Sequence, residues 1–148
     1  DVARFLGLCG SDYDRWQAAF LYLCMAPGVP SIFYGDEKKV TGIRETEYRR
    51  GMPWDEKHTD SEDFVKTVLR IRRDWISPED EWRAVYGGHD DKMIVFERYG
   101  AHTVRVIIHM GEAPADAERF MTGGQLLLLK GAVSHMLEKN GFAVLLMA

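Results

Sequence analysis

Residues 27–37 read PGVPSIFYGDE, and this stretch decides how the first half of the chain is interpreted. Pro27 and Gly28 end the apolar stretch before them, because proline cannot continue a helix and glycine favours a helix end. Pro30 keeps the backbone extended, and residues 31–34 form a short apolar run that predicts a buried strand. A short buried strand directly after a helix is typical of a parallel sheet covered by helices, which indicates an α/β architecture.

Helices are predicted on both sides of this strand. Residues 12–26 carry apolar side chains almost all round, and Ser11 is the expected N-cap of a largely buried helix. Residues 61–75 show the spacing of an amphipathic helix with one apolar face. The polar stretch at residues 36–60 is a long loop, and loops of this length in compact domains are usually functional.

The period of the sequence changes to two in the second half of the chain. Residues 92–99 and 103–110 alternate between the two faces of a strand, and the Gly100–Ala101 junction between them indicates a hairpin. Further strands are predicted at residues 82–86, 125–129 and 142–147. We therefore expect a small antiparallel β-domain after a linker at residues 77–81.

The composition excludes several classes of protein. The formal net charge of −4 and the dispersed Lys and Arg residues argue against nucleic acid, and no apolar run is long enough to cross a membrane. The two cysteines, Cys9 and Cys24, indicate no disulfide framework, and Cys24 is expected to be a buried thiol. With no signal peptide in view, we expect a cytoplasmic protein. The five histidines lack the spacing of metal ligands, so no metal site is expected.

Three motifs resemble the α-amylase family of glycoside hydrolases. Residues 27–37 resemble the segment around the eighth barrel strand of that family, and residues 49–55, RRGMPWD, resemble its Arg-Arg-Pro-Met-Pro-Trp run. Residues 1–6, DVARFL, resemble the stretch that follows its last conserved His-Asp pair. The order and spacing of the motifs resemble the neopullulanase and cyclomaltodextrinase branch, over about the first half of the chain. Because the chain begins without methionine and is too short for the whole enzyme, we expect a C-terminal fragment.

The resemblance implies a fold for each half of the chain. Residues 1–77 are expected to be the last segment of a (β/α)₈ TIM barrel, with its eighth strand at residues 32–34. Residues 78–148 are expected to be a C-terminal antiparallel β-sandwich domain. The barrel strand would lack its neighbours in this chain, so we expect repacking, self-association or ordering through the remainder of the catalytic barrel.

The resemblance also implies a chemistry. The family uses a carboxylate nucleophile, an acid and a third carboxylate in retaining hydrolysis of α-glucans. Asp1 matches the third carboxylate, whereas the other two lie on earlier strands, so the chain alone is expected to be inactive. Arg49 and Glu45 match positions that reach donor-side sugars, although Glu45 stands where the family has Asp. The implied partner is an α-glucan oligosaccharide without an organic cofactor. Calcium is frequent in the wider family, but no ligand cluster in this sequence supports it.

Two alternatives accompany these assignments. Arg49 has the alternative role of a structural ion pair with Glu45 or Asp36. The departures at Glu45 and at Gly51, which replaces the usual proline, give some support to a different function. That alternative is a non-catalytic carbohydrate-binding or structural module of an inactive amylase-like barrel.

Overall fold

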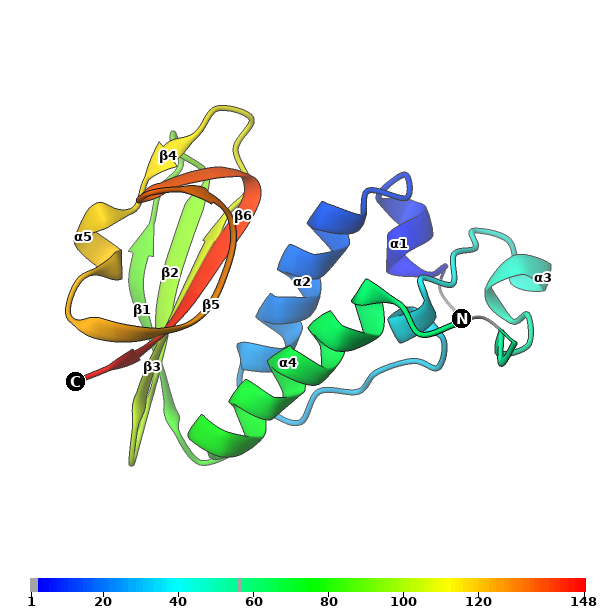
Figure 1. Cartoon of the computed structure of the whole chain (residues 1–148), viewed down its shortest axis with the longest axis horizontal. Helices are drawn as coiled ribbons and strands as arrows, with labels where there is room; N and C mark the ends of the chain where they lie inside the picture. The colour runs from blue at the N-terminus through cyan, green and yellow to red at the C-terminus, as the bar shows by residue number, and fades with distance from the viewer. Residues whose placement is uncertain (1–2, 56) are drawn as a thin grey trace.

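The chain folds into two layers in the computed structural model, which describes residues 3–55 and 57–148. Helices of the first half pack against one face of a sheet formed by the second half (Figure 1). The helices are α1 (Phe5–Leu8), α2 (Tyr13–Met25), the 3₁₀ turn η1 (Asp36–Lys38), α3 (Glu45–Tyr48), α4 (Asp60–Trp75) and α5 (Glu118–Met121). The strands are β1 (Glu81–Gly87), β2 (Met93–Tyr99), β3 (Thr103–His109), β4 (Ala115–Asp116), β5 (Gly124–Val133) and β6 (Met136–Met147).

Both long helices that the sequence predicts are present. α2 begins after Asp12, whose carboxylate accepts the backbone N–H of Arg15 at 3.0 Å, so the prediction of Ser11 as the N-cap is wrong. Ser11 has a left-handed backbone with φ of 62° in the turn before α2. α4 begins after Thr59, whose backbone N–H donates to the carboxylate of Glu62 at 2.8 Å. An acidic side chain therefore satisfies a backbone donor at the positive end of each helix.

The described strands all belong to one antiparallel sheet. β3 and β5 lie on opposite edges of β6, and β2 and β1 follow beyond β3. The predicted hairpin is confirmed, because β2 and β3 pair without a register shift from Met93↔His109 to Tyr99↔Thr103. The expected β-sandwich of two packed sheets is corrected to this single sheet, which curls into a half-barrel. Register shifts within β1 and β5 support the curl, since bulges bend and twist a strand.

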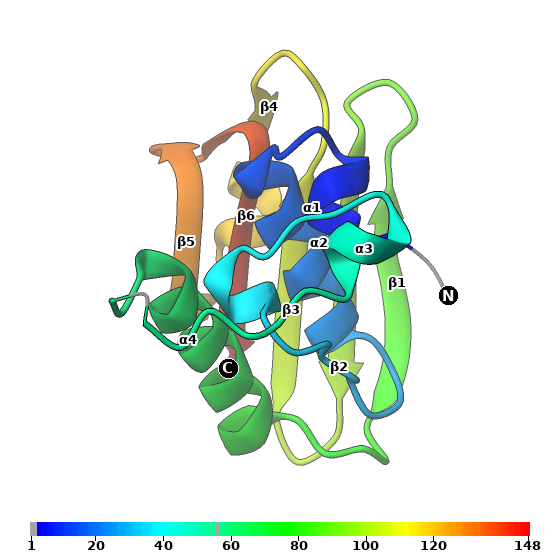
Figure 2. The ribbon, with the colours of Figure 1, turned by 90° about the vertical axis from the view of Figure 1, so that its right-hand side faces the viewer.

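The main hydrophobic core lies between the helices and the sheet. Phe64 of α4 lies 5.9 Å from Phe142 of β6 between ring centroids, and Tyr22 of α2 lies 5.7 Å from Phe96 of β2. Figure 2 shows α2 and α4 lying across the sheet on this side. The alternation predicted for β3 is confirmed, because Val104, Val106 and Ile108 all belong to this core.

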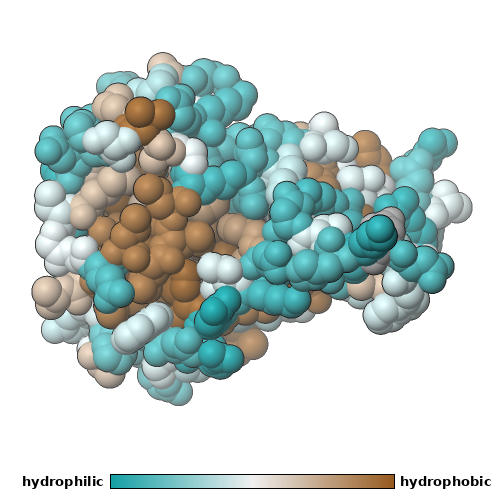
Figure 3. All heavy atoms as spheres, in the orientation of Figure 1, coloured by the Kyte–Doolittle hydropathy of each residue, from teal (hydrophilic) through white to brown (hydrophobic). Residues whose placement is uncertain are grey.

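A smaller core lies on the opposite face of the sheet, where α5 packs. Its buried members come from alternate positions of the strands and from α5: Met93, Val95, Ile107, Ala115, Ala117, Phe120, Leu137, Ala143 and Leu145. The space-filling view shows hydrophobic residues gathered over the sheet and hydrophilic residues over much of the helical layer (Figure 3). The central strands β2, β3 and β6 are buried on both faces over most of their length, which is why they are so rich in aliphatic side chains, whereas β1 and β5 are more exposed.

Neither cysteine forms a disulfide. Cys24 is fully buried in the main core, where desolvation raises the pKa of its thiol to about 12. Cys9 is partly buried, and its sulfur donates to the carbonyls of Leu6 and Asp12 at 3.4 Å. The prediction of a buried thiol at Cys24 is confirmed.

The predicted strand at residues 31–34 is wrong for this chain. Ser31, Ile32 and Phe33 lie in irregular backbone, and Tyr34 begins a turn. Among the described residues, the sheet is built only from positions after 80, so this segment has no strand to pair with. Phe33 and Tyr34 remain 49% and 42% exposed as a result.

Two buried arginines enclose the C-terminal end of α2. Arg98 of β2 is fully buried, and desolvation lowers the pKa of its guanidinium, with a further contribution from the charge of Arg72. The terminal nitrogens of Arg98 donate to four backbone carbonyls, those of Met25 (3.2 Å), Ala26 (2.9 Å), Ser77 (3.1 Å) and Asp80 (3.0 Å). Arg72 of α4 donates to the carbonyls of Cys24, Ala26 and Gly28. The last carbonyls of α2, which have no partner within the helix, are thereby satisfied.

We expect Arg98→Met to lower the free energy of unfolding by about 3 kcal/mol, because the carbonyls of Met25, Ser77 and Asp80 lose their donor, whereas that of Ala26 keeps Arg72. Urea unfolding followed by circular dichroism measures this change. The matched control is Arg83→Met on β1. The Arg83 side chain is 49% exposed, so this substitution should change the free energy of unfolding by less than about 0.5 kcal/mol. Equal losses in the two variants would contradict a specific role for the carbonyl contacts.

Candidate functional site

Arg4 joins segments that lie far apart in the sequence. Its residue is 4% exposed, and Nη1 donates to the carbonyl of Tyr34 at 2.8 Å and to the carboxylate of Asp36 at 3.0 Å. Nε donates to the carbonyl of Tyr48 at 3.1 Å. The guanidinium carbon also lies 4.4 Å from the ring centroid of Phe33. Arg4 therefore fixes the loop after α2 and the end of α3 against the start of α1.

A glycine allows the loop to present Asp36 to Arg4. Gly35 has φ of 84°, a left-handed backbone conformation that residues other than glycine rarely adopt. A Cβ atom at this position would also lie 2.8 Å from Cγ2 of Val40. The carbonyl of Gly35 accepts the N–H groups of Lys38 and Val40 at 3.0 Å and 2.9 Å, which closes the turn.

Three charged residues of this turn, Asp36, Lys38 and Lys39, form ion pairs with neighbouring segments. Partial burial raises the pKa of the Asp36 carboxyl, while the neighbouring guanidinium of Arg4 acts in the opposite direction. Lys38 forms an ion pair with Glu62 of α4 at 3.1 Å, and Lys39 forms one with Asp60 at 2.9 Å. The turn is therefore held both to the N-terminal segment and to the start of α4.

The structure brings together Arg49 and Glu45, the two residues that the sequence analysis assigns to sugar binding. Arg49 Nη1 lies 3.2 Å from Glu45 Oε1, one turn apart at the short helix α3, and both side chains are more than half exposed. Of the two ion-pair partners considered for Arg49, Glu45 is the one that it contacts. Asp36 pairs instead with Arg4.

A cavity of about 390 Å³ lies beside this pair. Its lining residues come from the N-terminal segment, the loop after α2 and the end of α3: Ala3, Arg4, Phe5, Phe33, Asp36, Tyr48 and Arg49. The cavity combines aromatic rings with charged groups of both signs, a mixture suited to a ligand with apolar faces and hydroxyl edges. Arg49 offers a planar fork of donors at its rim.

The remaining residue of the predicted site, Asp1, lies outside the described residues. Among the aromatic candidates for sugar stacking, Tyr48 lines the cavity, and the Tyr34 hydroxyl donates to the carbonyl of Arg50 at 2.9 Å. Trp54 is 81% exposed. Within the described part of the chain, no group of three metal-ligating side chains lies among the residues around Arg4.

Sequence comparison relates this chain to two enzymes that cleave glucans. It is 29% identical over 127 residues to a cyclomaltodextrinase of Geobacillus thermopakistaniensis (strain MAS1). The aligned region covers 78% of this chain and 20% of that enzyme. It is also 35% identical over 74 residues to neopullulanase 2 of Thermoactinomyces vulgaris. This second aligned region covers 49% of this chain and 13% of that enzyme. The resemblance to the α-amylase family is confirmed. No protein-family model matches the chain.

A solved structure confirms the similarity of fold to the amylase family. The crystal structure of a debranching enzyme from Nostoc punctiforme matches 98% of this chain with a TM-score of 0.81 and 21% sequence identity. The matched region is 33% of that enzyme. This chain therefore spans a fifth or less of the curated amylase-family relatives above and a third of the matched structure. None of the described helices has the length and apolar character needed to span a membrane.

The role of Arg4 is a feature that the sequence analysis misses. Its contacts lie 30, 32 and 44 residues away along the chain, so no local sequence spacing could predict them. The only signal is its position within the family-like run DVARFL.

We expect Arg4→Lys to loosen the loop around Asp36 without unfolding the chain. Lysine keeps the charge next to Asp36, but it cannot donate to the carbonyls of Tyr34 and Tyr48 at the same time. The expected loss of stability is about 1–3 kcal/mol. Hydrogen exchange should become faster at residues 34–50, whereas β2 and β3 should stay protected. Unchanged exchange in the loop would contradict this role of Arg4.

Proposed function

We propose that this chain is the C-terminal part of a retaining α-glucan hydrolase or transglycosylase. The parent enzyme would act on α-1,4-linked glucans such as cyclodextrins, pullulan or maltooligosaccharides. The observation that carries this proposal is the match to a cyclomaltodextrinase over 78% of the chain, which corresponds to only 20% of that enzyme. The shared sequence includes too little of a barrel for catalysis, so the chain alone is proposed to be inactive.

The order of elements supports the assignment of residues 1–77 to the end of a (β/α)₈ barrel. α2, the loop with η1 and α3, and α4 follow in the order expected for the seventh helix, the eighth βα loop and the eighth helix. In such barrels the βα loops carry the active site. The cavity next to Arg49 is built from this loop and the N-terminal segment. Four expectations from the sequence stay predictions: the domain boundary at residue 77, the remainder of the barrel as a partner, self-association, and a cytoplasmic location.

The proposed chemistry divides the work among three groups of this chain. Asp1 would be the third carboxylate, which binds sugar hydroxyls and stabilises the positive charge of the oxocarbenium-like transition state. Arg49 would donate hydrogen bonds to a donor-side sugar, and the ion pair with Glu45 would hold its side chain in position. The nucleophile and the general acid would come from the longer protein.

We expect Asp1→Asn in the longer protein to lower kcat for cyclodextrin and maltotriose by about 10²- to 10³-fold, because the amide cannot stabilise positive charge. Reducing-sugar release measures turnover, and circular dichroism verifies that the fold is intact. Equal rates in the two proteins would remove Asp1 from the site.

Arg49→Ala in the longer protein should raise KM for maltooligosaccharides by about tenfold, equivalent to ~1.4 kcal/mol, through the loss of donors to a sugar. The matched control is Arg44→Ala, because Arg44 pairs with Glu47 on the same short helix at 2.7 Å and does not line the cavity. A similar KM for both variants and the unmodified enzyme would leave Arg49 with a structural role.

A non-catalytic carbohydrate-binding or structural module is the second candidate function. The observation that favours it is the departure from the family pattern at Glu45, which is one methylene longer than the usual Asp, and at Gly51 in place of proline. Calorimetric titration of the chain with maltooligosaccharide tests binding. Binding by a longer protein that shows no turnover would favour this candidate over the hydrolase.

A further inference from the structure

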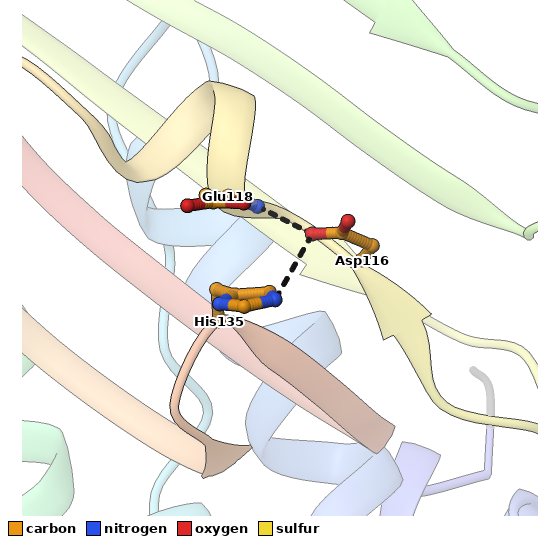
Figure 4. A group of neighbouring side chains, drawn as sticks. All are labelled: Asp116, Glu118 and His135. Atoms are coloured by element: carbon orange, nitrogen blue, oxygen red, sulfur yellow. Dashed lines mark hydrogen bonds and ion pairs between the residues drawn. The ribbon is translucent and has the colours of Figure 1, made fainter.

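Three side chains with metal-ligand chemistry meet at the end of the sheet far from the Arg4 site. Asp116 ends β4, Glu118 begins α5, and His135 lies in the turn between β5 and β6. Their ligand atoms all lie within 4.8 Å of one another. Figure 4 shows Asp116 and His135 facing each other across this junction, with Glu118 beside them.

The backbone beneath the three side chains is fixed by hydrogen bonds. Asp116 pairs with Met136 in the β4–β6 ladder, and the N–H of Ala117 donates to the carbonyl of His135 at 3.0 Å. Ala117 is fully buried in the smaller core. Two chain segments 17 or more residues apart therefore hold the backbone positions of the three residues together without a ligand, although the side chains themselves are largely exposed.

The surroundings of His135 also orient its ring. The hydroxyl oxygen of Ser134, which is not one of the three, lies 3.3 Å from Nδ1. Nε2 lies 3.8 Å from Oδ1 of Asp116, on the side of the carboxylates. In the tautomer whose Nδ1–H donates a hydrogen bond to this hydroxyl, the lone pair of Nε2 is free to bind a metal on the side of Asp116, an arrangement common for metal-bound histidines.

We propose that Asp116, Glu118 and His135 form a binding site for a divalent transition-metal ion of the Zn²⁺ class. Two carboxylates and a neutral imidazole balance the charge of a divalent ion, and the imidazole selects Zn²⁺ over Mg²⁺ and Ca²⁺, which prefer oxygen ligands. Three protein ligands leave a fourth position for water. The bound ion links β4 and α5 to the turn between β5 and β6.

An ion pair between Asp116 and His135 is the competing explanation for their proximity. That pair needs no contribution from Glu118, whereas a three-ligand site does. The dependence of Zn²⁺ binding on Glu118 therefore separates the two explanations.

The test is calorimetric titration of the 148-residue chain with ZnCl₂, and in parallel with MgCl₂ and CaCl₂. We expect one Zn²⁺ per chain and a loss of affinity of at least roughly tenfold in each of His135→Ala and Glu118→Gln, since each removes one ligand. The matched control is His89→Ala, because the His89 side chain is fully exposed and lies outside the three-residue group. Its affinity should equal that of the unmodified chain.

Nitrogen-15 NMR of the histidine rings adds a readout that does not depend on stability. On addition of ZnCl₂, the shift of His135 Nε2 should change, while His89 should be unaffected. Tight binding that Glu118→Gln leaves unchanged would overturn the site and leave the Asp116–His135 ion pair. Equal weakening by His89→Ala would show non-specific binding to surface histidines, and Mg²⁺ binding as tight as that of Zn²⁺ would overturn the assignment of metal class.

Discussion

The carbonyl groups at the buried end of α2 must find hydrogen-bond donors, and this requirement connects the two layers of the molecule. Arg72 of α4 and Arg98 of β2 supply those donors from the two layers. Because the donors of a guanidinium lie in a rigid plane, the two side chains also restrict where α4 and β2 can lie relative to α2. The helical layer and the sheet consequently share this polar junction in addition to their hydrophobic core. The boundary predicted at residue 77 falls within this junction, since the carbonyl of Ser77 is bonded to Arg98.

Elements whose pattern is local could be predicted from the sequence. The apolar face of α4 and the hairpin of β2 and β3 follow from periodicity alone, because each element's own side chains determine which face is buried. β5 and β6 are longer than predicted, since Gly131 and Asn140, both with φ of 58°, interrupt the alternation that marks a strand. The run at residues 31–34 shows the opposite error, because an apolar pattern makes a strand only where another strand offers hydrogen bonds.

The same distinction applies to the candidate sites. The resemblance to amylase-family motifs directs attention to Arg49 and Glu45, which are four residues apart and do meet at α3. Arg4 has no such neighbours in the sequence, and its partners become apparent only when the chain folds. The group of Asp116, Glu118 and His135 is likewise invisible to spacing rules, since its histidine lies 17 residues after its nearest carboxylate partner. Contacts between distant segments are what a single sequence reveals least.

The position of Arg98 also has a consequence for synthesis of the chain. Arg98 lies 72 residues after Ala26, whose carbonyl it binds. A ribosome that adds about 5–20 residues per second needs roughly 4–14 s to cover this distance. For the first 46 of these residues α2 has the donors of neither arginine, and after that it has only those of Arg72. The helical layer is therefore made well before the strand that supplies its second buried arginine, and its core with the sheet closes only after β6 and Phe142 have followed.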